Sequence, residues 1–576
     1  MKNFSIKNTI IFAGVFIFLF LLVFFFSLFQ INPLIDSGRE FYLPLRVLNG
    51  DILYKDIFNI YGPLAYQINA SSYQIFGADI NSLRIFGSLN AVLIMIAVFF
   101  ILKEFLSENY RENFSRILLL WFCPLISGVF YIGIFNYTVP YAFAMTYGLC
   151  FFLFSLFLFI KFVKQKNAFP LLLSAFFAGC AAACKYEFIP YLIFLFMYIA
   201  FALKNNKKIF LLSVVFSLII PLLSFGTLFI QGMTADDLIK TSKIIKTMTQ
   251  TEAIKYFYHN FTGVYFNLKV FGFCLLKTVL FSVLIIIFYF AEKFYRDDKI
   301  LFPITLIFVV LGIVYIGFGC FSLFAIFHLA LFLCFIKKIF QNKPLFILMF
   351  SVILLSMKNF FAVNYNVYGT YVLPFIMISL GIFVYTIDFS FKEELKDTMK
   401  KSFMIILISF LVMSGSETIA GMYSKVRGVI TVEPVKNSGN VFEKIQKTVY
   451  SYPNVAKIMN ETIAFINKNT SPDDTIVILP ESQFLNFVTK RPADNLYDSI
   501  TPLYLETFGE ENIIFHFKET RPKYFILNNR DSSDYGKKYI CEDYGQNLCK
   551  FIKKDYEKIW EIGENKFMLQ IYRRTD

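Results

Sequence analysis

The charged residues best suited to chemistry lie in one short stretch after the first long apolar segment. Residues 31–66 read INPLIDSGREFYLPLRVLNGDILYKDIFNIYGPLAY, with Asp36, Arg39, Glu40, Lys55 and Asp56 among them. If the chain is helical after Pro33, Asp36 and Glu40 share a face because they are four residues apart. A carboxylate there can accept a proton, and Arg39 and Lys55 can hold a phosphate group. Further along, Tyr61, Gly62 and Pro63 mark a turn.

The elements that position these residues are too apolar for a water-soluble protein. Of the 576 residues, 57% are hydrophobic and only 17% are charged, and the mean hydropathy is +0.59. Hydrophobic runs of roughly 17 to 25 residues, long enough to cross a bilayer as helices, recur from Ile10 to Ala420. The sequence therefore predicts an all-α polytopic membrane domain.

Hydropathy predicts about thirteen spans, and the charges between them predict their orientation. We expect spans near 9–30, 84–102, 117–133, 140–160, 168–184, 187–203, 209–230, 268–291, 300–318, 320–336, 344–358, 368–388 and 402–421. Alternate connections are short and rich in Lys and Arg, which favours a cytoplasmic N-terminus. The apolar run at 9–30 is long and lacks a clear small-residue cleavage site, which favours an uncleaved first helix over a signal peptide. An odd number of spans then places the 31–83 loop and residues 425–576 outside.

The C-terminal tail differs in kind from the spans. TIVILP (475–480), KYFILNN (523–529) and FMLQIY (567–572) have the composition of buried strands. They alternate with stretches of helical periodicity at 454–469 and 547–560. We therefore expect a transmembrane domain over 1–424 and a small extracytoplasmic α/β domain over 425–576.

The order of residues after the first span resembles the first external loop of GT-C-type membrane glycosyltransferases. Asp36 is followed by Arg39 and Glu40, then by NGDILYKD and YGPL. The superfamily includes protein O-mannosyltransferases, the lipid A aminoarabinose transferase and the RgtA/B/C/D-like bacterial enzymes. Stretches similar to the last branch are NYTVPYAFAMTYG (136–148), GCAAACKYE (179–187), LFIQGMTADDL (228–238), NVYGTYVLP (366–374), DDTIVILPESQFLNFVTKRP (473–492), RPKYFILNNRDSSDYG (521–536) and DYGQNLCKFI (543–552). The Lys-Pro-Pro signature of the aminoarabinose branch is absent, so that branch's substrate cannot be carried over.

This resemblance implies an activity and roles for the first-loop residues. It implies transfer of a hexose or pentose from a polyprenyl-phosphate donor to a hydroxyl of lipid A, a cell-surface glycan or a protein, at the outer face of the bacterial cytoplasmic (inner) membrane. Asp36 matches the family's catalytic acid/base, and Glu40 is assigned beside it. Asp56, Tyr61, Gly62 and Pro63 would form the substrate loop. A glycosyl phosphate breaks through an oxocarbenium-like transition state, so one base driving direct displacement predicts inversion.

Ionisable residues elsewhere extend the expected site. Lys185 and Glu187 lie between two apolar spans; Lys185 is expected to bind donor phosphate or to form an interfacial ion pair, with Glu187 as its partner. Lys358 is a second candidate phosphate ligand or a snorkelling anchor. Asp236 and Asp237 are expected to cap a helix, with a catalytic or metal role as the alternative.

Other functions and ligands remain open from the sequence. A solvated loop whose charges only fix topology would also account for the first loop. A transporter or flippase for a lipid-linked or charged solute is the main rival function, although it needs no folded outer domain. An O-antigen polymerase or ligase is a second rival, but the 231–267 loop lacks the arginines expected for it.

The composition gives little indication of a cofactor or of a nucleic-acid partner. The net charge of +14 suits membrane lipids and AT-rich coding rather than nucleic acid. Three scattered histidines give a zinc site little to build on, so no metal is assigned, while a need for Mg²⁺ or Mn²⁺ stays open. Of nine cysteines, only Cys541 and Cys549 are placed to pair.

Overall fold

A computed structural model describes most of the chain. Its described residues are 6–29, 31–35, 37–106, 123–124, 127, 143–204, 206–259, 268–316, 322–357, 372–386, 393–432, 448–494, 496–497, 499–564 and 567–575. Asp36 and Lys358, both predicted site residues, lie outside this set, as does most of the predicted span 117–133.

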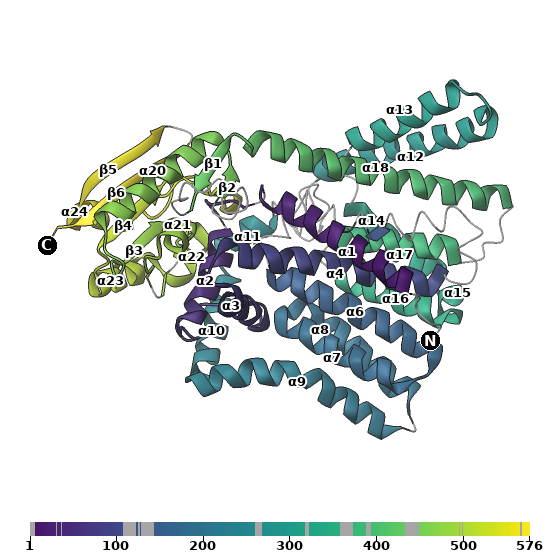
Figure 1. Cartoon of the computed structure of the whole chain (residues 1–576), viewed down its shortest axis with the longest axis horizontal. Coiled ribbons are helices and arrows are strands. Elements are labelled where there is room, and N and C mark those ends of the chain that lie inside the picture. The colour runs from purple at the N-terminus through teal and green to yellow at the C-terminus, as the bar shows by residue number, and fades with distance from the viewer. Residues whose placement is uncertain are drawn as a thin grey trace.

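Apolar helices form a bundle with a sheet-containing region at one end (Figure 1). The helices of the bundle are α1 (Ile6–Ser27), α4 (Ile80–Leu106), α6 (Phe143–Gln165), α7 (Ala168–Cys184), α8 (Ile189–Ala202), α9 (Lys207–Gln231), α12 (Leu268–Tyr295), α13 (Leu301–Ile316), α14 (Ser322–Cys334), α15 (Ile336–Gln341), α16 (Lys343–Leu355), α17 (Leu373–Thr386) and α18 (Glu393–Lys425). Among the described residues, four segments are long and apolar enough to cross a membrane, namely α4, α6, α9 and Leu275–Tyr295 of α12. Several shorter apolar helices accompany them, as expected for a multi-pass membrane protein.

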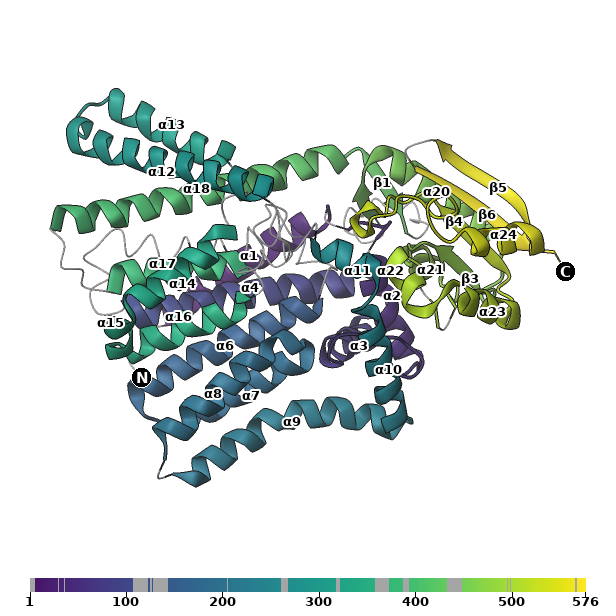
Figure 2. The same cartoon turned by 180° about the vertical axis from the view of Figure 1, so that it is seen from behind.

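Burial separates the inside of the bundle from its lipid-facing side. In α6, 78% of the most apolar window is buried, because the helix packs between α4 and α7. In α9 and in α12 the corresponding share is 17%. The hairpin of α12 and α13 packs along α18 and projects away from the bundle (Figures 1 and 2). Its outer surface carries large apolar side chains, including Leu280, Ile304 and Leu311. Such a surface is stable against hydrocarbon, since lipid replaces the protein contacts that an aqueous protein would need.

Short helices fill the space between the bundle and the sheet region. They are α2 (Ser37–Leu48) and α3 (Leu64–Phe76) from the 31–83 loop, and α10 (Ala235–Met248) and α11 (Glu252–Phe257) from the 231–267 loop. Both views place α2, α3, α10 and α11 at this end, while the N-terminus lies at the opposite end of the bundle (Figures 1 and 2). The capping role expected at the start of α10 is confirmed for Asp237, whose side chain closes a capping box with Thr234. The N-cap residue itself is Thr234, and Asp236 lies in the first turn.

The sheet region, residues 428–575, follows directly after α18. A two-stranded sheet pairs β1 (Gly428–Thr431) with β2 (Thr448–Ser451). A four-stranded sheet has the order β3-β4-β6-β5, with β3 (Ile476–Leu479) parallel to β4 (Tyr524–Asn528) and the other pairs antiparallel. The other two strands are β5 (Tyr556–Glu564) and β6 (Phe567–Arg574). The helices are α20 (Pro453–Asn469), α21 (Phe484–Thr489), α22 (Pro502–Phe508), α23 (Glu510–Thr520) and α24 (Gln546–Asp555), with a short helix η7 at Ser533–Tyr535.

The strands predicted near 475–480, 523–529 and 567–572 are confirmed, but one helix was predicted too long. The helix expected over 547–560 ends at Asp555, and β5 begins at Tyr556. The reason is the partner strand: residues 556–564 pair with β6 almost throughout, a long-range contact that overrides local periodicity. Cys541 and Cys549 form a disulfide at the start of α24.

Candidate functional site

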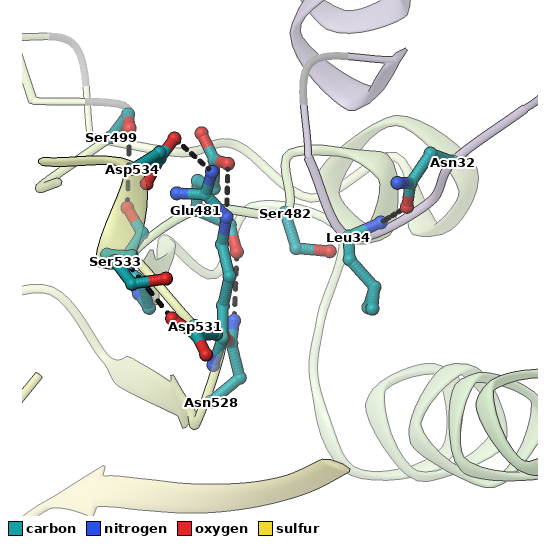
Figure 3. Close-up of polar contacts among 12 residues, drawn as sticks. Asn32, Leu34, Glu481, Ser482, Ser499, Asn528, Asp531, Ser533 and Asp534 are labelled. Carbon is teal, nitrogen blue, oxygen red and sulfur yellow. Dashed lines mark hydrogen bonds and ion pairs between the residues drawn. The ribbon is translucent and has the colours of Figure 1, made fainter. Parts of the chain in front are cut away.

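The first loop is anchored to the sheet region at the start of α2. Gly38 lies so close to α21 that a Cβ atom would stand 2.3 Å from the backbone nitrogen of Phe484. The Phe41 ring stacks on Phe487 with centroids 5.1 Å apart. Ser482 donates a hydrogen bond of 2.8 Å to the Pro33 carbonyl and faces the Asn32–Leu34 turn (Figure 3). Residues on both sides of position 36 are therefore held against the sheet region.

Glu40 is a buried carboxylate in α2. Its side chain is 2% exposed, and Oε2 accepts a hydrogen bond of 3.4 Å from the backbone N–H of Phe143 at the start of α6. The Arg39 guanidinium is 4.0 Å from Glu40 Oε1 and stays partly exposed. A buried carboxylate is costly unless hydrogen bonds or a cation compensate it, and both are present here.

Tyr66 of α3 completes this buried group. Burial raises the pKa of Tyr66 well above its ordinary value, and the nearby negative charge of Glu40 adds to the rise. Arg39 acts in the opposite direction, and Tyr61 and Tyr504 also lie close enough to contribute. Tyr66 is therefore a neutral phenol at physiological pH, which can donate a hydrogen bond beside Glu40.

Lys185 is a buried ammonium where α7 ends. Its side chain is 8% exposed, and Nζ lies 2.9 Å from Glu187 Oε1. The same Nζ stands over the Tyr61 ring, 5.3 Å from its centroid. The expected ion pair of Lys185 with Glu187 is confirmed by this geometry.

The turn at Tyr61, Gly62 and Pro63 docks on the same helix end. Gly62 donates a backbone hydrogen bond of 3.1 Å to the Cys184 carbonyl. A Cβ atom on Gly62 would stand 1.9 Å from the Ala183 carbonyl oxygen, so only glycine fits. The predicted turn and the predicted phosphate-binding lysine, far apart in sequence, thus meet in space.

Lys55 and Asp56 lie elsewhere in the loop and support its shape. Lys55 Nζ donates to the Gly232 carbonyl at 3.1 Å, against the turn between α9 and α10. Asp56 Oδ2 accepts from the backbone of Ile52 at 2.9 Å, and the Asp56 carbonyl accepts from Arg46 at 3.0 Å. Arg46 in turn pairs with Asp51 at 2.6 Å.

Three tyrosines near Glu40 and the Lys185–Glu187 pair were not predicted from the sequence. Tyr66, Tyr258 and Tyr504 come from α3, from the end of α11 and from α22. Burial raises the pKa of Tyr258; Glu187 raises it further, and Lys185 lowers it, so Tyr258 lies near that ion pair. No spacing in the sequence indicates that residues from three separate segments converge.

A partly buried ion-pair cluster lies next to the segment that anchors the start of α2. Arg530 contacts Glu481 at 3.0 Å and Asp534 at 3.6 Å. Asn528 donates to the Glu481 carbonyl at 2.8 Å (Figure 3). These residues follow the carboxyl ends of the parallel strands β3 and β4, the edge where α/β sheets commonly bind ligands. The cluster fixes the segment whose Ser482 holds Pro33.

Within the described ranges, no group of three or more His, Cys, Asp or Glu residues is arranged to hold a metal ion. The alternative metal role for Asp236 and Asp237 gains no support there. Asp237 instead accepts hydrogen bonds from Thr234, and these lower its pKa.

Comparison with known proteins gives weak likeness over nearly the full length. No protein family model matches this chain, and no curated protein matches it. Among solved structures, ArnT from Cupriavidus metallidurans bound to undecaprenyl phosphate is 11% identical with a TM-score of 0.44, covering 97% of this chain and 98% of that one. Its apo state is 12% identical with a TM-score of 0.41, covering 97% of each chain.

Proposed function

We propose that this protein is an inverting GT-C-type glycosyltransferase of the bacterial cytoplasmic membrane. It moves a sugar from a polyprenyl-phosphate donor to an acceptor hydroxyl at the outer face, with residues 425–576 forming an extracytoplasmic domain. The observation that supports this best is the Lys185 and Glu187 ion pair docked on the Tyr61-Gly62 turn of the acidic first loop. A buried cation beside a carboxylate-bearing loop is what the breaking of a glycosyl phosphate requires.

Lys185 is assigned to the donor phosphate. In a partly buried site its attraction for phosphate is stronger than in water, because the dielectric constant is lower. Glu187 keeps the ammonium neutralised until phosphate arrives beside it. Arg39, whose guanidinium is partly exposed, is placed to contact a second phosphate oxygen. In the same proposal Lys55 acts more remotely by bracing the loop against Gly232, and Lys358 is kept as a second phosphate ligand.

Asp36 is assigned as the base that takes the proton of the acceptor hydroxyl. Its neighbours are fixed by the Ser482 to Pro33 hydrogen bond and by the close packing of Gly38 on Phe484. A carboxylate between fixed neighbours can take few positions relative to the acceptor hydroxyl, which lowers the entropic cost of reaching the reactive geometry. Glu40, held by Arg39 and Phe143, orients the loop rather than taking the proton.

The position of this site at one end of the bundle suits the donor. A polyprenyl chain is apolar and stays in the hydrocarbon, while its phosphate lies at headgroup level. The bundle exposes apolar side chains along its sides, and the polar loops gather at the sheet-region end (Figure 1). The donor can therefore enter sideways from the lipid with its phosphate level with Lys185.

The replacement Asp36→Asn tests the proposal. It keeps the shape but removes the base, so transfer from polyprenyl-phosphate sugar should fall by roughly 10²-fold or more. Glu40→Gln should be milder, and Asp237→Asn, which alters only the cap of α10, serves as the matched control. Membrane insertion and abundance are measured beside transfer. A well-inserted Asp36→Asn protein with normal transfer would refute the assignment and favour the transporter.

A further inference from the structure

A cleft opens between α11 and the sheet region. Its volume is about 440 Å³, and its lining includes Tyr256 and Lys255 on one side and Glu506, Tyr535 and Lys537 on the other. This volume falls in the range of about 300 to 1,000 Å³ that is typical of small-molecule sites.

The two walls are fixed to one another by specific contacts. Glu506 Oε2 accepts a hydrogen bond of 2.9 Å from the backbone N–H of Ala253, the second residue of α11. The rings of Phe257 and Tyr535 stack with centroids 5.6 Å apart. Gly536 has φ +81° and lies so close to the Tyr256 ring that a Cβ atom would stand 3.0 Å from it. The cleft is therefore a built feature rather than a gap between loosely placed parts.

The lining combines aromatic faces with charged groups. Tyr256 remains 45% exposed, and Glu506 and Lys537 pair at 3.5 Å with part of each side chain open to solvent. A sugar ring presents C–H groups on its faces and hydroxyls around its edge. The C–H face packs on the negative face of an aromatic ring, and the hydroxyls hydrogen-bond to a carboxylate or an ammonium.

The helices that line the cleft, α11 and α22, also carry residues near the first loop and the Lys185–Glu187 pair. Tyr258, two residues after Tyr256, feels the charges of both Lys185 and Glu187. Tyr504, on the same helix as Glu506, packs edge-on against Phe58 of the first loop, with centroids 6.1 Å apart. The helix that contributes Glu506 to the cleft therefore also contacts the first loop, at Phe58.

From these contacts we infer that the cleft binds a carbohydrate part of the acceptor. This inference rests on the proposed function and names the chemical class of its acceptor. The donor's polyprenyl chain is a poor occupant, because charged side chains rim the cleft. A peptide is also a poorer fit, because the described lining comes from helices and a turn, with no strand edge to pair with a peptide backbone.

The test uses the full-length protein in fluorescent nanodiscs on a microarray of bacterial envelope saccharides and Ser/Thr-containing peptides. Wild type should bind one class of saccharide, and Tyr256→Ala and Glu506→Gln should weaken this binding about tenfold or more. Tyr256→Phe keeps the ring and should retain binding. Tyr539→Ala removes a tyrosine of the sheet region outside the cleft and is the matched control.

Binding of undecaprenyl phosphate, measured on the same preparations, separates the two proposals. It should be unchanged in Tyr256→Ala. Wild type that binds undecaprenyl phosphate but no saccharide, or binds peptides instead, would overturn the cleft assignment and leave the proposed function standing. Equal saccharide binding by wild type and both cleft variants would also overturn it. Saccharide binding without undecaprenyl phosphate binding would overturn the proposed function and leave a saccharide site.

Discussion

Two regions of the molecule contain the same kinds of residue in opposite surroundings. One is the junction, where the Tyr61-Gly62 turn meets Lys185 at the end of α7, and the other is the α12–α13 hairpin. Each has a lysine over an aromatic ring: Lys185 stands 5.3 Å from the Tyr61 centroid, and Lys277 stands 4.8 Å from that of Phe273. Each also has a glycine: Gly62 lies in a turn packed against the end of α7, and Gly272 lies in α12, where nothing is within 4 Å of an added Cβ atom. Lys185 is buried and pairs with the Glu187 carboxylate. In the hairpin, the Phe273 ring over which Lys277 stands is 47% exposed.

The difference reflects what surrounds the side chains in each region: lipid around the hairpin and protein in the junction. In the hairpin, apolar side chains face outward and lipid supplies their contacts, so a single side chain carries little of the structure. In the junction, protein replaces solvent around charged groups, so each contact there is specific. Matched substitutions in the two regions should therefore have unequal effects.

The largest difference is expected between Lys185→Ala and Lys277→Ala. Loss of Lys185 removes the proposed phosphate ligand and leaves Glu187 without its ammonium, so transfer should fall by roughly 10²-fold or more. Lys277→Ala should leave transfer within about twofold. Sugar transfer from polyprenyl phosphate, normalised to inserted protein, measures both. Similar losses in the two variants would mean that the lysines act only on folding, and the comparison would fail.

A second difference is expected between Gly62→Ala and Gly272→Ala. The added methyl group at position 62 collides with the Ala183 carbonyl, so the turn must move, at a cost of about 1 to 3 kcal/mol. At position 272 the methyl group meets open space and replaces glycine inside a helix, which should leave stability equal or slightly higher. Thermal unfolding in detergent, followed by tryptophan fluorescence, checks this. An unshifted unfolding temperature for Gly62→Ala would contradict the observed packing.

The smallest difference concerns alkaline pH. The folded-state pKa of Tyr66 is raised above its ordinary value near 10 by burial and by Glu40. Its contribution to stability is therefore fully present below pH ~10 and is lost as the pH rises toward the folded-state pKa, at about 1.4 kcal/mol per pH unit. Tyr66→Phe should unfold less steeply between about pH 10 and 11 than wild type, and Tyr289→Phe in α12 should behave as wild type does. If the free energy of unfolding changed with pH equally in wild type and both variants, the Tyr66 hydroxyl would have to be exposed to water in the folded protein.

Sequence patterns predicted the elements better than the contacts between them. Hydropathy located helices such as α9 and α12, because a bilayer imposes length and composition on each segment separately. The strand β3 was found because four consecutive apolar residues between turn residues fit a buried strand. The strand β5 was missed because its pairing with β6 is a tertiary contact that local periodicity does not encode.

In the candidate site too, single residues were predicted from the sequence but the contacts between them were not. Lys185 and the Tyr61-Gly62-Pro63 turn were selected singly, from a lysine between apolar spans and from turn composition. Their meeting, through the Gly62 to Cys184 hydrogen bond, depends on how α7 packs on the first loop. Tyr258 and Tyr504 had no signal of their own, since a single tyrosine in a short helix or at its end has no distinctive spacing. Asp36 and Lys358 lie outside the described residues and stay predictions.

The strand order of the sheet region has a consequence for biosynthesis. Strand β6 follows the other three strands of this sheet in the sequence, yet it lies between β4 and β5. The four-stranded sheet can therefore close only after Phe567–Arg574 has been synthesised, and β4 keeps an open edge until then. A chain that stops before Phe567 would leave the sheet split, with β5 unable to join it.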